Sequence, residues 1–395
     1  MPSFQDVLHL QDQRLGKVGM AALAPVLAGL PRLDTVEVYA HGQEHADEST
    51  CVLARALAGR RSLTALLGIC VGDKGAATVA RCLLQTTNLA RLTCYCCASV
   101  AGLSQITPSI GTLPHLRELG LGLLDKRLDR LTLGLVESAR LSLTQLQIVC
   151  DTFNTDNSDV LGPIVSRCSQ LRDLRVMAKD IETDGEEPRQ CPHLAAFAGN
   201  LTRLHLESEN EGTFIACIPT MTALQHLSLR AAAPRRESAR DWQALCAPLA
   251  ALPGLTALEL ETMLNPGDGG DAVAGLSLLT ALRHLEFLRN PWDPSDVSAV
   301  APALRHMAAL TELQLYEPQW GRERPVGGHE PSLGAVSAAV AVLATHVSAL
   351  SQLRVLDVWL WGPRHRELRD SAAGQALVRS LRRCPGARVI FGHDE

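Results

Sequence analysis

Residues 113–121 read Leu-Pro-His-Leu-Arg-Glu-Leu-Gly-Leu, a pattern of the form L-x-x-L-x-x-L-x-L. The same spacing returns far downstream, where residues 252–260 read Leu-Pro-Gly-Leu-Thr-Ala-Leu-Glu-Leu. The last three positions alternate apolar and polar with period two, which is typical of a short strand with one buried face. Recurrence of one short pattern along the chain favours a repeat structure over a single irregular core.

Thirteen copies of this pattern share one register. Successive copies are spaced close to 28 residues apart as far as Leu313, and only the last interval, 43 residues from Leu313 to Leu356, departs from that period. Aligned on the penultimate apolar position, the copies fall at Leu8, Val36, Leu66, Leu92, Leu119, Leu146, Leu174, Leu204, Leu227, Leu258, Leu285, Leu313 and Leu356. These residues are called the leucine column below.

A turn and a helix are expected after most strands. Residues 71–75 read Val-Gly-Asp-Lys-Gly and predict a turn, Asp296 is expected to cap a helix that carries Val297, Val300 and Leu304, and a further helix is expected over residues 332–348. Because one strand and one helix cannot bury their apolar faces alone, stacking is required. The sequence therefore predicts an α/β solenoid, a horseshoe of about 13 repeats with a parallel concave sheet and convex helices.

The expected domain organisation is one repeat domain over residues 1–395. Residues 317–331 are rich in Pro and Gly and account for the long last interval, so we expect a loop insertion there. Residues 350–395 are expected to form the C-terminal repeat and its cap, because the terminal unit of a solenoid must cover an otherwise exposed core.

Composition narrows the class of protein. Apolar residues make up 46% of the chain and aromatic residues 4%, so Leu, Ala and Val must fill the core. The 37 basic and 42 acidic residues leave a net charge of -5, which argues against a nucleic-acid or anionic-membrane binder. The chain shows neither a signal-peptide pattern nor a run of eighteen apolar residues, so we expect an intracellular, cytoplasmic protein with reduced cysteines; cytoskeletal or ciliary association is an alternative location.

The repeats resemble those of leucine-rich-repeat proteins, and their strand-turn-helix period is similar to the ribonuclease-inhibitor-like subclass. That family usually places Asn or Cys five residues after the leucine column, where only Asn290 and Cys97 match in this chain. The resemblance implies a non-enzymatic scaffold that binds another protein. The alternative that it also implies is a regulator of an enzyme, of the GTPase-activating or ubiquitin-ligase substrate-recruiting type.

Sequence motifs for chemistry are weak. Residues 41–45 spell the zinc-protease pattern H-x-x-E-H, but Gly42 and the strand just before it make a helix there doubtful. Cys94 and Cys97 occupy repeat positions that favour core cysteines over a thiolate metal site. Neither the phosphate-binding pattern G-x-x-x-x-G-K-[ST] nor the nucleophile pattern G-x-S-x-G occurs. We therefore expect no catalytic residue, no cofactor and no metal.

Aromatic residues mark the expected binding surface. All three tyrosines follow the final apolar residue of a strand, a position that faces out of the concave sheet and that Ile69 takes in the repeat of Leu66. Such exposed rings are typical of protein interfaces, although Tyr also favours strands in general. The expected partner-binding tyrosines are Tyr39, Tyr95 and Tyr316.

A second aromatic cluster lies near the C-terminus, on one edge of three successive repeats. Tryptophan combined with arginine is typical of binding hot spots, and sealing of the terminal core is the competing interpretation, favoured most for Trp361. The expected partner-binding residues are Trp292, Trp320, Arg322, Arg324, Trp359, Trp361, Arg364 and Arg366.

Charge on the strands favours a protein partner. The position between the two strand leucines carries Glu37, Glu259, Glu286 and Asp357 but a single arginine, Arg175. An acidic sheet repels phosphates, so we expect a protein partner, no nucleic acid and no membrane.

Overall fold

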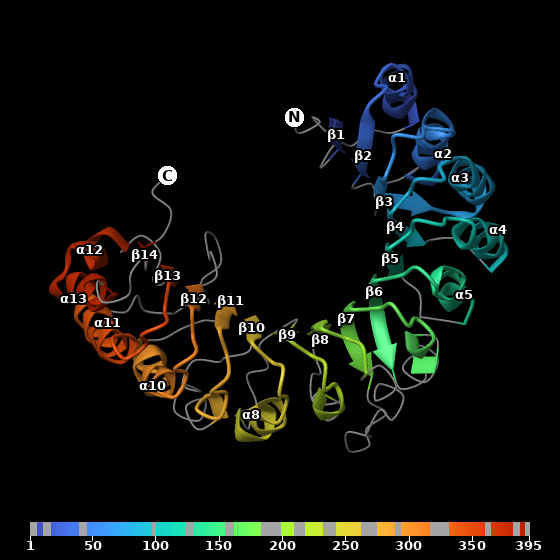
Figure 1. Ribbon diagram of the computed structural model, residues 1–395. Coiled ribbons are helices and arrows are strands. Elements are labelled where there is room, and N and C mark those ends of the chain that lie inside the picture. The colour runs from blue at the N-terminus through green and yellow to red at the C-terminus, as the bar shows by residue number, and fades with distance from the viewer. Residues whose placement is uncertain are drawn as a thin grey trace. The chain divides into compact units, whose positions relative to one another are not determined.

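A computed structural model describes residues 6–10, 17–38, 46–96, 100–123, 130–154, 162–163, 165–182, 199–208, 218–231, 242–261, 275–288, 294–316, 332–359, 365–381 and 388–391. The chain divides into two compact units, Met1–Leu201 and Thr202–Glu395. In each unit the strands form a parallel sheet and the helices pack on its outer side (Figure 1).

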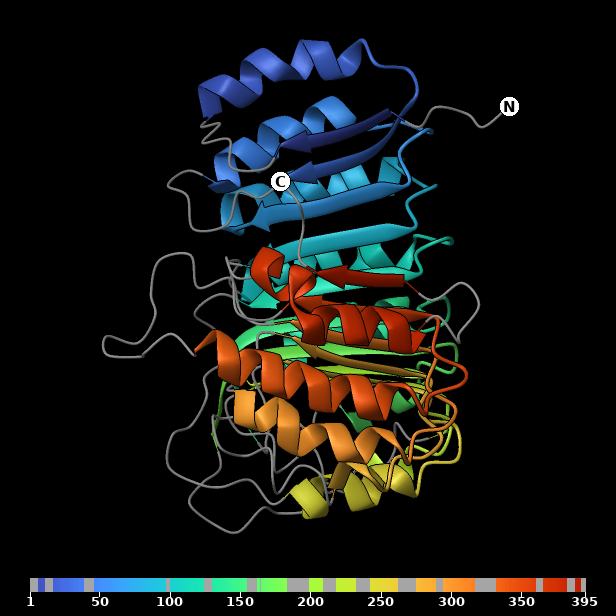
Figure 2. The same cartoon turned by 90° about the vertical axis from the view of Figure 1, so that its left-hand side faces the viewer.

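The first unit has a parallel sheet whose strands follow one another in chain order. Figure 2 shows its blue and cyan strands side by side, running in one direction. The strands are β1 (Asp6–Leu10), β2 (Leu33–Val38), β3 (Ala65–Val71), β4 (Arg91–Cys96), β5 (Glu118–Leu123), β6 (Gln145–Asn154) and β7 (Asp173–Glu182). The helices between them are α1 (Lys17–Ala28), α2 (Ala46–Leu57), α3 (Asp73–Gln85), α4 (Val100–Gly111) and α5 (Arg130–Ala139).

The second unit repeats this plan. Its strands are β8 (Arg203–Ser208), β9 (His226–Ala231), β10 (Ala257–Glu261), β11 (His284–Leu288), β12 (Glu312–Tyr316), β13 (Val355–Trp359) and β14 (Arg388–Phe391). Its helices are the 3-10 turn η2 (Ile218–Thr220) and the α-helices α8 (Trp242–Ala250), α10 (Pro294–Leu304), α11 (Leu333–Val347), α12 (His365–Asp370) and α13 (Ala372–Leu381).

The leucine column is confirmed within each unit. Every column residue pairs with the next column residue on the neighbouring strand, from Leu8 to Leu174 in the first unit and from Leu204 to Leu356 in the second. From Val36 onward none of them exposes more than 2% of its surface. Since full burial of one such side chain contributes about 1.5–3 kcal/mol, this stacked column contributes substantially to stability. The fold is a leucine-rich-repeat solenoid.

The register slips between Asp6 and Val7 at the start of β1, and again within β3. Leu66 pairs with Leu92 as expected, but Ile69 pairs with Cys94, so β3 holds one extra residue between these two pairs. Gly68 lies in this bulge with φ of 76°. Counting from the column placed Ile69 among the outward residues, and that assignment is wrong, because the bulge turns the Ile69 side chain into the core.

Threonine side chains reinforce the sheet where its strands begin. Two residues before the column, the hydroxyl groups donate to backbone carbonyls of the preceding repeat: Thr144 to Arg117, Thr256 to Gln225 and Thr311 to Arg283. The backbone N–H groups of the same threonines donate to the same carbonyls. Threonine side chains therefore link neighbouring repeats at the start of these strands. Asn290 and Cys97, the two residues that match the family pattern, lie outside the described residues.

The predicted helices are confirmed with changes at their first turns. The helix expected over residues 332–348 is α11, and the Ser332 hydroxyl accepts a hydrogen bond from the Ala335 N–H at 3.2 Å, as an N-cap does. Asp296 is buried inside the first turn of α10 and does not precede the helix, so the capping prediction is wrong for Asp296, although Val297, Val300 and Leu304 are buried as expected.

The turn predicted over residues 71–75 is wrong in its extent. β3 ends at Val71 and α3 begins at Asp73, so Gly72 alone links them. Asp47, from the preceding helix α2, accepts hydrogen bonds from the N–H groups of Gly72 at 2.8 Å and Gly75 at 3.1 Å. A carboxylate of the neighbouring repeat therefore accepts hydrogen bonds from the backbone N–H groups at the N-terminus of α3. No local sequence pattern predicts this contact between repeats.

Candidate functional site

The outward side chains of β8–β12 form a polar surface in the second unit. Alternation along each strand turns the leucine column toward the helices and the other positions toward the free side of the sheet. This surface, called the polar face, carries Arg203, His205, Glu207, His226, Ser228, Arg230, Glu259, Glu261, His284, Glu286, Glu312 and Gln314.

Arg230 links three strands of the polar face. Its Nη1 lies 3.3 Å from Glu207 Oε2 on β8, and its Nε lies 3.3 Å from Glu261 Oε1 on β10. All three side chains are largely buried, with Glu261 side-chain exposure at only 11%. A guanidinium held between two carboxylates in this way has little freedom to move. The three side chains at the carboxyl ends of these strands are therefore already held in place by one another.

Histidine joins the next pair of strands. His226 Nε2 on β9 lies 2.8 Å from Glu259 Oε1 on β10. This hydrogen bond lowers the pKa of the Glu259 carboxyl below its ordinary value, against the opposing effect of burial. On the other side, His205 Nδ1 lies 2.7 Å from Ser228 Oγ, so β8 and β9 are tied by side chains as well.

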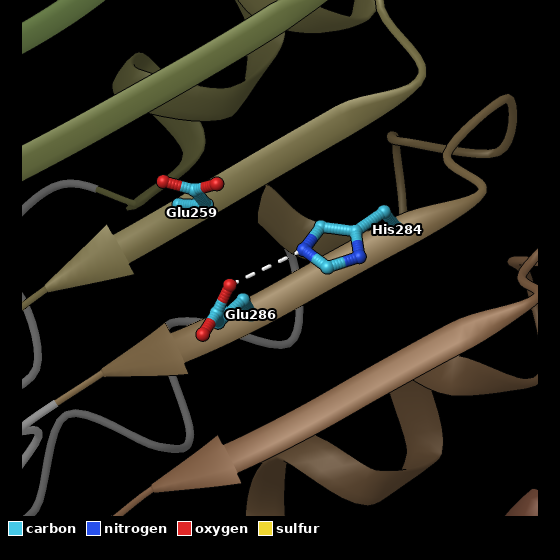
Figure 3. A group of neighbouring side chains, drawn as sticks. All are labelled: Glu259, His284 and Glu286. Carbon is cyan, nitrogen blue, oxygen red and sulfur yellow. Dashed lines mark hydrogen bonds and ion pairs between the residues drawn. The ribbon is translucent and has the colours of Figure 1, made fainter. Parts of the chain in front are cut away.

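His284 stands between two carboxylates. Its Nε2 lies 3.3 Å from Glu286 Oε2 on its own strand (Figure 3). Its Nδ1 lies 3.0 Å from Glu312 Oε2 on β12. The hydrogen bond to Glu286 is the main reason why the pKa of His284 is raised, with Glu312 adding to the shift and burial opposing it. Glu259 approaches the same place from β10, and the ligand atoms of Glu259, His284 and Glu286 lie within 4.8 Å of one another.

The polar face carries an acidic excess. Two arginines, Arg203 and Arg230, stand against five carboxylates. The carboxylates are Glu207, Glu259, Glu261, Glu286 and Glu312. The acidic sheet expected from Glu259 and Glu286 therefore extends over four of the five strands, β8, β10, β11 and β12.

The outward surface of the first unit has a different character. β5 presents two glycines, Gly120 and Gly122, and side chains of β4 lie across them. A Cβ atom on Gly122 would stand 2.1 Å from Tyr95 Cδ1, and one on Gly120 would stand 2.7 Å from Thr93 Oγ1. The Tyr95 ring is half-buried there, and this burial raises the pKa of its phenol. Tyr95 is thus on the free face of the sheet, as expected, with its ring lying over β5.

The structure places the other expected partner-binding residues as follows. Tyr316 and Trp359 pair in register at the ends of β12 and β13, so the backbone brings them side by side. Arg366 lies in α12, and its side chain, like those of Tyr316 and Trp359, is outside the description. The residues outside the described parts of the chain are Tyr39, Trp292, Trp320, Arg322, Arg324, Trp361 and Arg364.

The sequence analysis missed several residues of the polar face, and three of them share one position in the repeat. His226, His284 and Glu312 each stand directly before the leucine column, and only the two later outward positions were considered. Their shared position in three repeats is the signal that would have found them. Their contacts could not be found from spacing, because His226 and Glu259 are 33 residues apart and meet only through the sheet.

Of the sequence motifs for metal and thiol chemistry, the structure describes only the cysteines in part. Residues 41–45 and Cys97 lie outside the described residues. Cys94 is buried, as predicted for a core cysteine. The side chains of seven cysteines are described, and none of those seven forms a disulfide bond. Burial raises the pKa of Cys168 to about 11 and of Cys246 to about 12, which keeps both as unreactive thiols.

Comparison with known proteins finds similarity only at the level of structure. Neither a protein-family model nor a curated protein matches the sequence. A chain of the TLR13–ssRNA13 complex aligns over 84% of this chain and 40% of its own length, with 16% identity and a TM-score of 0.43. A chain of the yeast Rad7–Elc1 complex aligns over 95% of this chain and 88% of its own, with 14% identity and a TM-score of 0.47. This chain thus spans about two fifths of the TLR13 chain, and the fold assignment rests on the strand register and repeat spacing.

Over the part of the chain that the structure describes, no helix has the length and apolar character needed to cross a membrane.

Proposed function

We propose that this chain is a non-enzymatic scaffold that holds a protein partner on the polar face of β8–β12. The proposal rests on the contacts that hold the side chains of that face in place. Arg230, His226 and His284 tie neighbouring strands together through carboxylates, although the core lies on the opposite side of the sheet. Side chains that are already held in place lose little conformational entropy on binding, which favours association.

Charge supports a basic protein segment as the partner. Five carboxylates against two arginines attract Lys and Arg side chains and repel phosphates, so a protein is favoured over a nucleic acid. Tyr316 and Trp359 pair at the ends of β12 and β13, next to the polar face. This pairing supports a second contact with the partner, in which the C-terminal cluster of aromatic residues and arginines forms an apolar edge of the polar face.

We also assign the repeats to the ribonuclease-inhibitor-like subclass and the protein to an intracellular compartment. The subclass assignment is supported by the α-helices that follow strands at a spacing near 28 residues, such as α3 and α4. The location is supported by the seven cysteines with described side chains, none of which forms a disulfide bond, as in a reducing compartment. A GTPase-activating or ubiquitin-ligase-recruiting role is a special case of the proposed scaffold, and partner identity would reveal it.

One matched pair of variants tests the proposal. Gln314→Arg places a long cation in the polar face on β12, and Ala341→Arg places the same side chain on the exposed outer surface of α11. Both variants are expected to keep the wild-type melting temperature. Gln314→Arg should lose at least about 90% of the protein partner that co-purifies with the tagged chain, a loss of about 1.4 kcal/mol or more, while Ala341→Arg retains it. Equal recovery by both variants would refute the proposed face.

A further inference from the structure

Glu259, His284 and Glu286 meet on one face of the sheet. Glu259 on β10 is the direct ladder partner of Glu286 on β11, and His284 stands two residues before Glu286 on the same strand. Figure 3 shows the three side chains on the same side of the two strands. All three are partly buried, with side-chain exposures of 24%, 21% and 15% respectively.

Two carboxylates directly opposite each other in a sheet repel and destabilise it unless a cation stands between them. Here the Nε2 atom of His284 faces Glu286, while Glu259 is held by His226 on the other side. A neutral imidazole nitrogen and two carboxylate oxygens form a ligand set that suits a first-row transition ion such as Zn²⁺, and the histidine makes it a poor set for Ca²⁺.

The separation of the ligand atoms also suits such an ion. His284 Nε2 and Glu286 Oε2 are 3.3 Å apart, longer than the roughly 2.7–2.9 Å of a charge-assisted hydrogen bond. Two ligand atoms at about 2.0–2.1 Å from a tetrahedral zinc ion are themselves about 3.3 Å apart. The third ligand atom, on Glu259, lies within 4.8 Å of both, so a small closing movement of its side chain completes three protein ligands.

Neighbouring side chains orient these ligands. Glu312 Oε2 lies 3.0 Å from His284 Nδ1, which presents Nε2 toward Glu286, and His226 holds Glu259 at 2.8 Å. A carboxylate on the far nitrogen of a metal-binding histidine is the usual outer support of a zinc site, since it holds the ring orientation and raises the basicity of the ligand.

We propose that Glu259, His284 and Glu286 bind one divalent transition-metal ion of the Zn²⁺ class, with Glu312 as a positioning residue and the fourth coordination position open to the free side of the sheet. The ion would replace the repulsion between Glu259 and Glu286 with two metal–oxygen bonds. It would thereby cross-link β10 to β11 at the centre of the polar face.

The test is calorimetric titration of ZnCl₂ into the full chain. His284→Ala removes a ligand, and His205→Ala removes a histidine of the same face that contacts Ser228 and lies outside the cluster. Circular dichroism verifies that both variants fold. We expect one site whose Kd rises at least about tenfold in His284→Ala, is unchanged in His205→Ala and rises about 10–100-fold in Glu312→Gln, the range found for outer-shell partners.

Co²⁺ gives a second readout that separates this site from cysteine sites. Bound Co²⁺ should give visible absorption that depends on His284, without a thiolate charge-transfer band, because the proposed ligands are nitrogen and oxygen. Titration without saturable binding, or a Kd for Zn²⁺ that His284→Ala leaves unchanged, would overturn the proposal. A thiolate band on the cobalt complex that persists in His284→Ala would assign the metal to cysteines instead.

Discussion

The Tyr95 ring lies over Gly122 on the neighbouring strand, so closely that a Cβ atom on Gly122 would stand 2.1 Å from Tyr95 Cδ1 and 3.1 Å from its Cγ. These atoms are at the base of the ring, so the ring cannot avoid an added methyl group by moving only its far end. β4 and β5 therefore fit together through an aromatic residue and a glycine, and the Tyr95 ring is held against the sheet.

Gly122→Ala is expected to destabilise the protein by about 1–3 kcal/mol, because the Tyr95 side chain must leave its position over β5. Chemical denaturation measures the free energy of unfolding. The control is Gly111→Ala at the end of α4, where a new Cβ would be 3.5 Å from its nearest neighbour, an ordinary contact. An unchanged stability for Gly122→Ala would contradict the close packing of these two residues.

The bulge in β3 leads to a second prediction. Gly68 and Gly59 have nearly the same positive φ, 76° and 77°, but a Cβ on Gly68 would stand 1.9 Å from the Val38 carbonyl oxygen while one on Gly59 would meet nothing within 4 Å. Gly59→Ala should therefore destabilise the protein by about 1–2 kcal/mol through backbone strain alone. Gly68→Ala adds a clash with backbone and should cost about 3 kcal/mol or more.

The comparison of the two glycine variants uses unfolding curves measured under one condition. Similar losses for Gly59→Ala and Gly68→Ala would show that the bulge does not pack against Val38. Such a result would also mean that the bulge at Gly68 does not explain why the Ile69 side chain points into the core.

Sequence reasoning recovered the parts of the fold that repeat. The leucine column pairs residue by residue within each unit, because every L-x-L end puts its leucines on the same face of a strand. β14 was not anticipated, since Arg388–Phe391 lacks the upstream leucines of the pattern, yet Val389 pairs with Leu356 as a further column residue would. Ile69 was misplaced because one inserted residue reverses the face of everything that follows it.

The polar face was recovered only in part. Glu259 and Glu286 were identified as outward acidic residues, but their partners His226 and His284 were not. Such pairs form between different repeats, so they depend on the register of neighbouring strands and on side-chain rotamers. Neither is contained in the spacing of residues along one strand.

The C-terminal aromatic cluster leads to a third prediction. Trp320→Ala combined with Trp359→Ala should leave the melting temperature nearly unchanged and abolish recovery of the protein partner, because rings that bind a partner stabilise the complex and not the fold. Differential scanning fluorimetry and quantitative affinity purification measure the two effects. Leu141→Ala, which truncates a side chain with 79% exposure in the first unit, is the control. A large fall in melting temperature with full partner recovery would assign these tryptophans to a cap.

The most direct test of the scaffold is photo-cross-linking from each side of one repeat. A benzophenone amino acid at position 314 stands on the polar face, and one at position 341 stands on the exposed surface of α11. The account predicts a cross-linked protein partner from position 314 at a yield at least about tenfold above that from position 341. Equal yields, cross-linking from position 341 alone, or cross-linking of RNA from position 314 would contradict it.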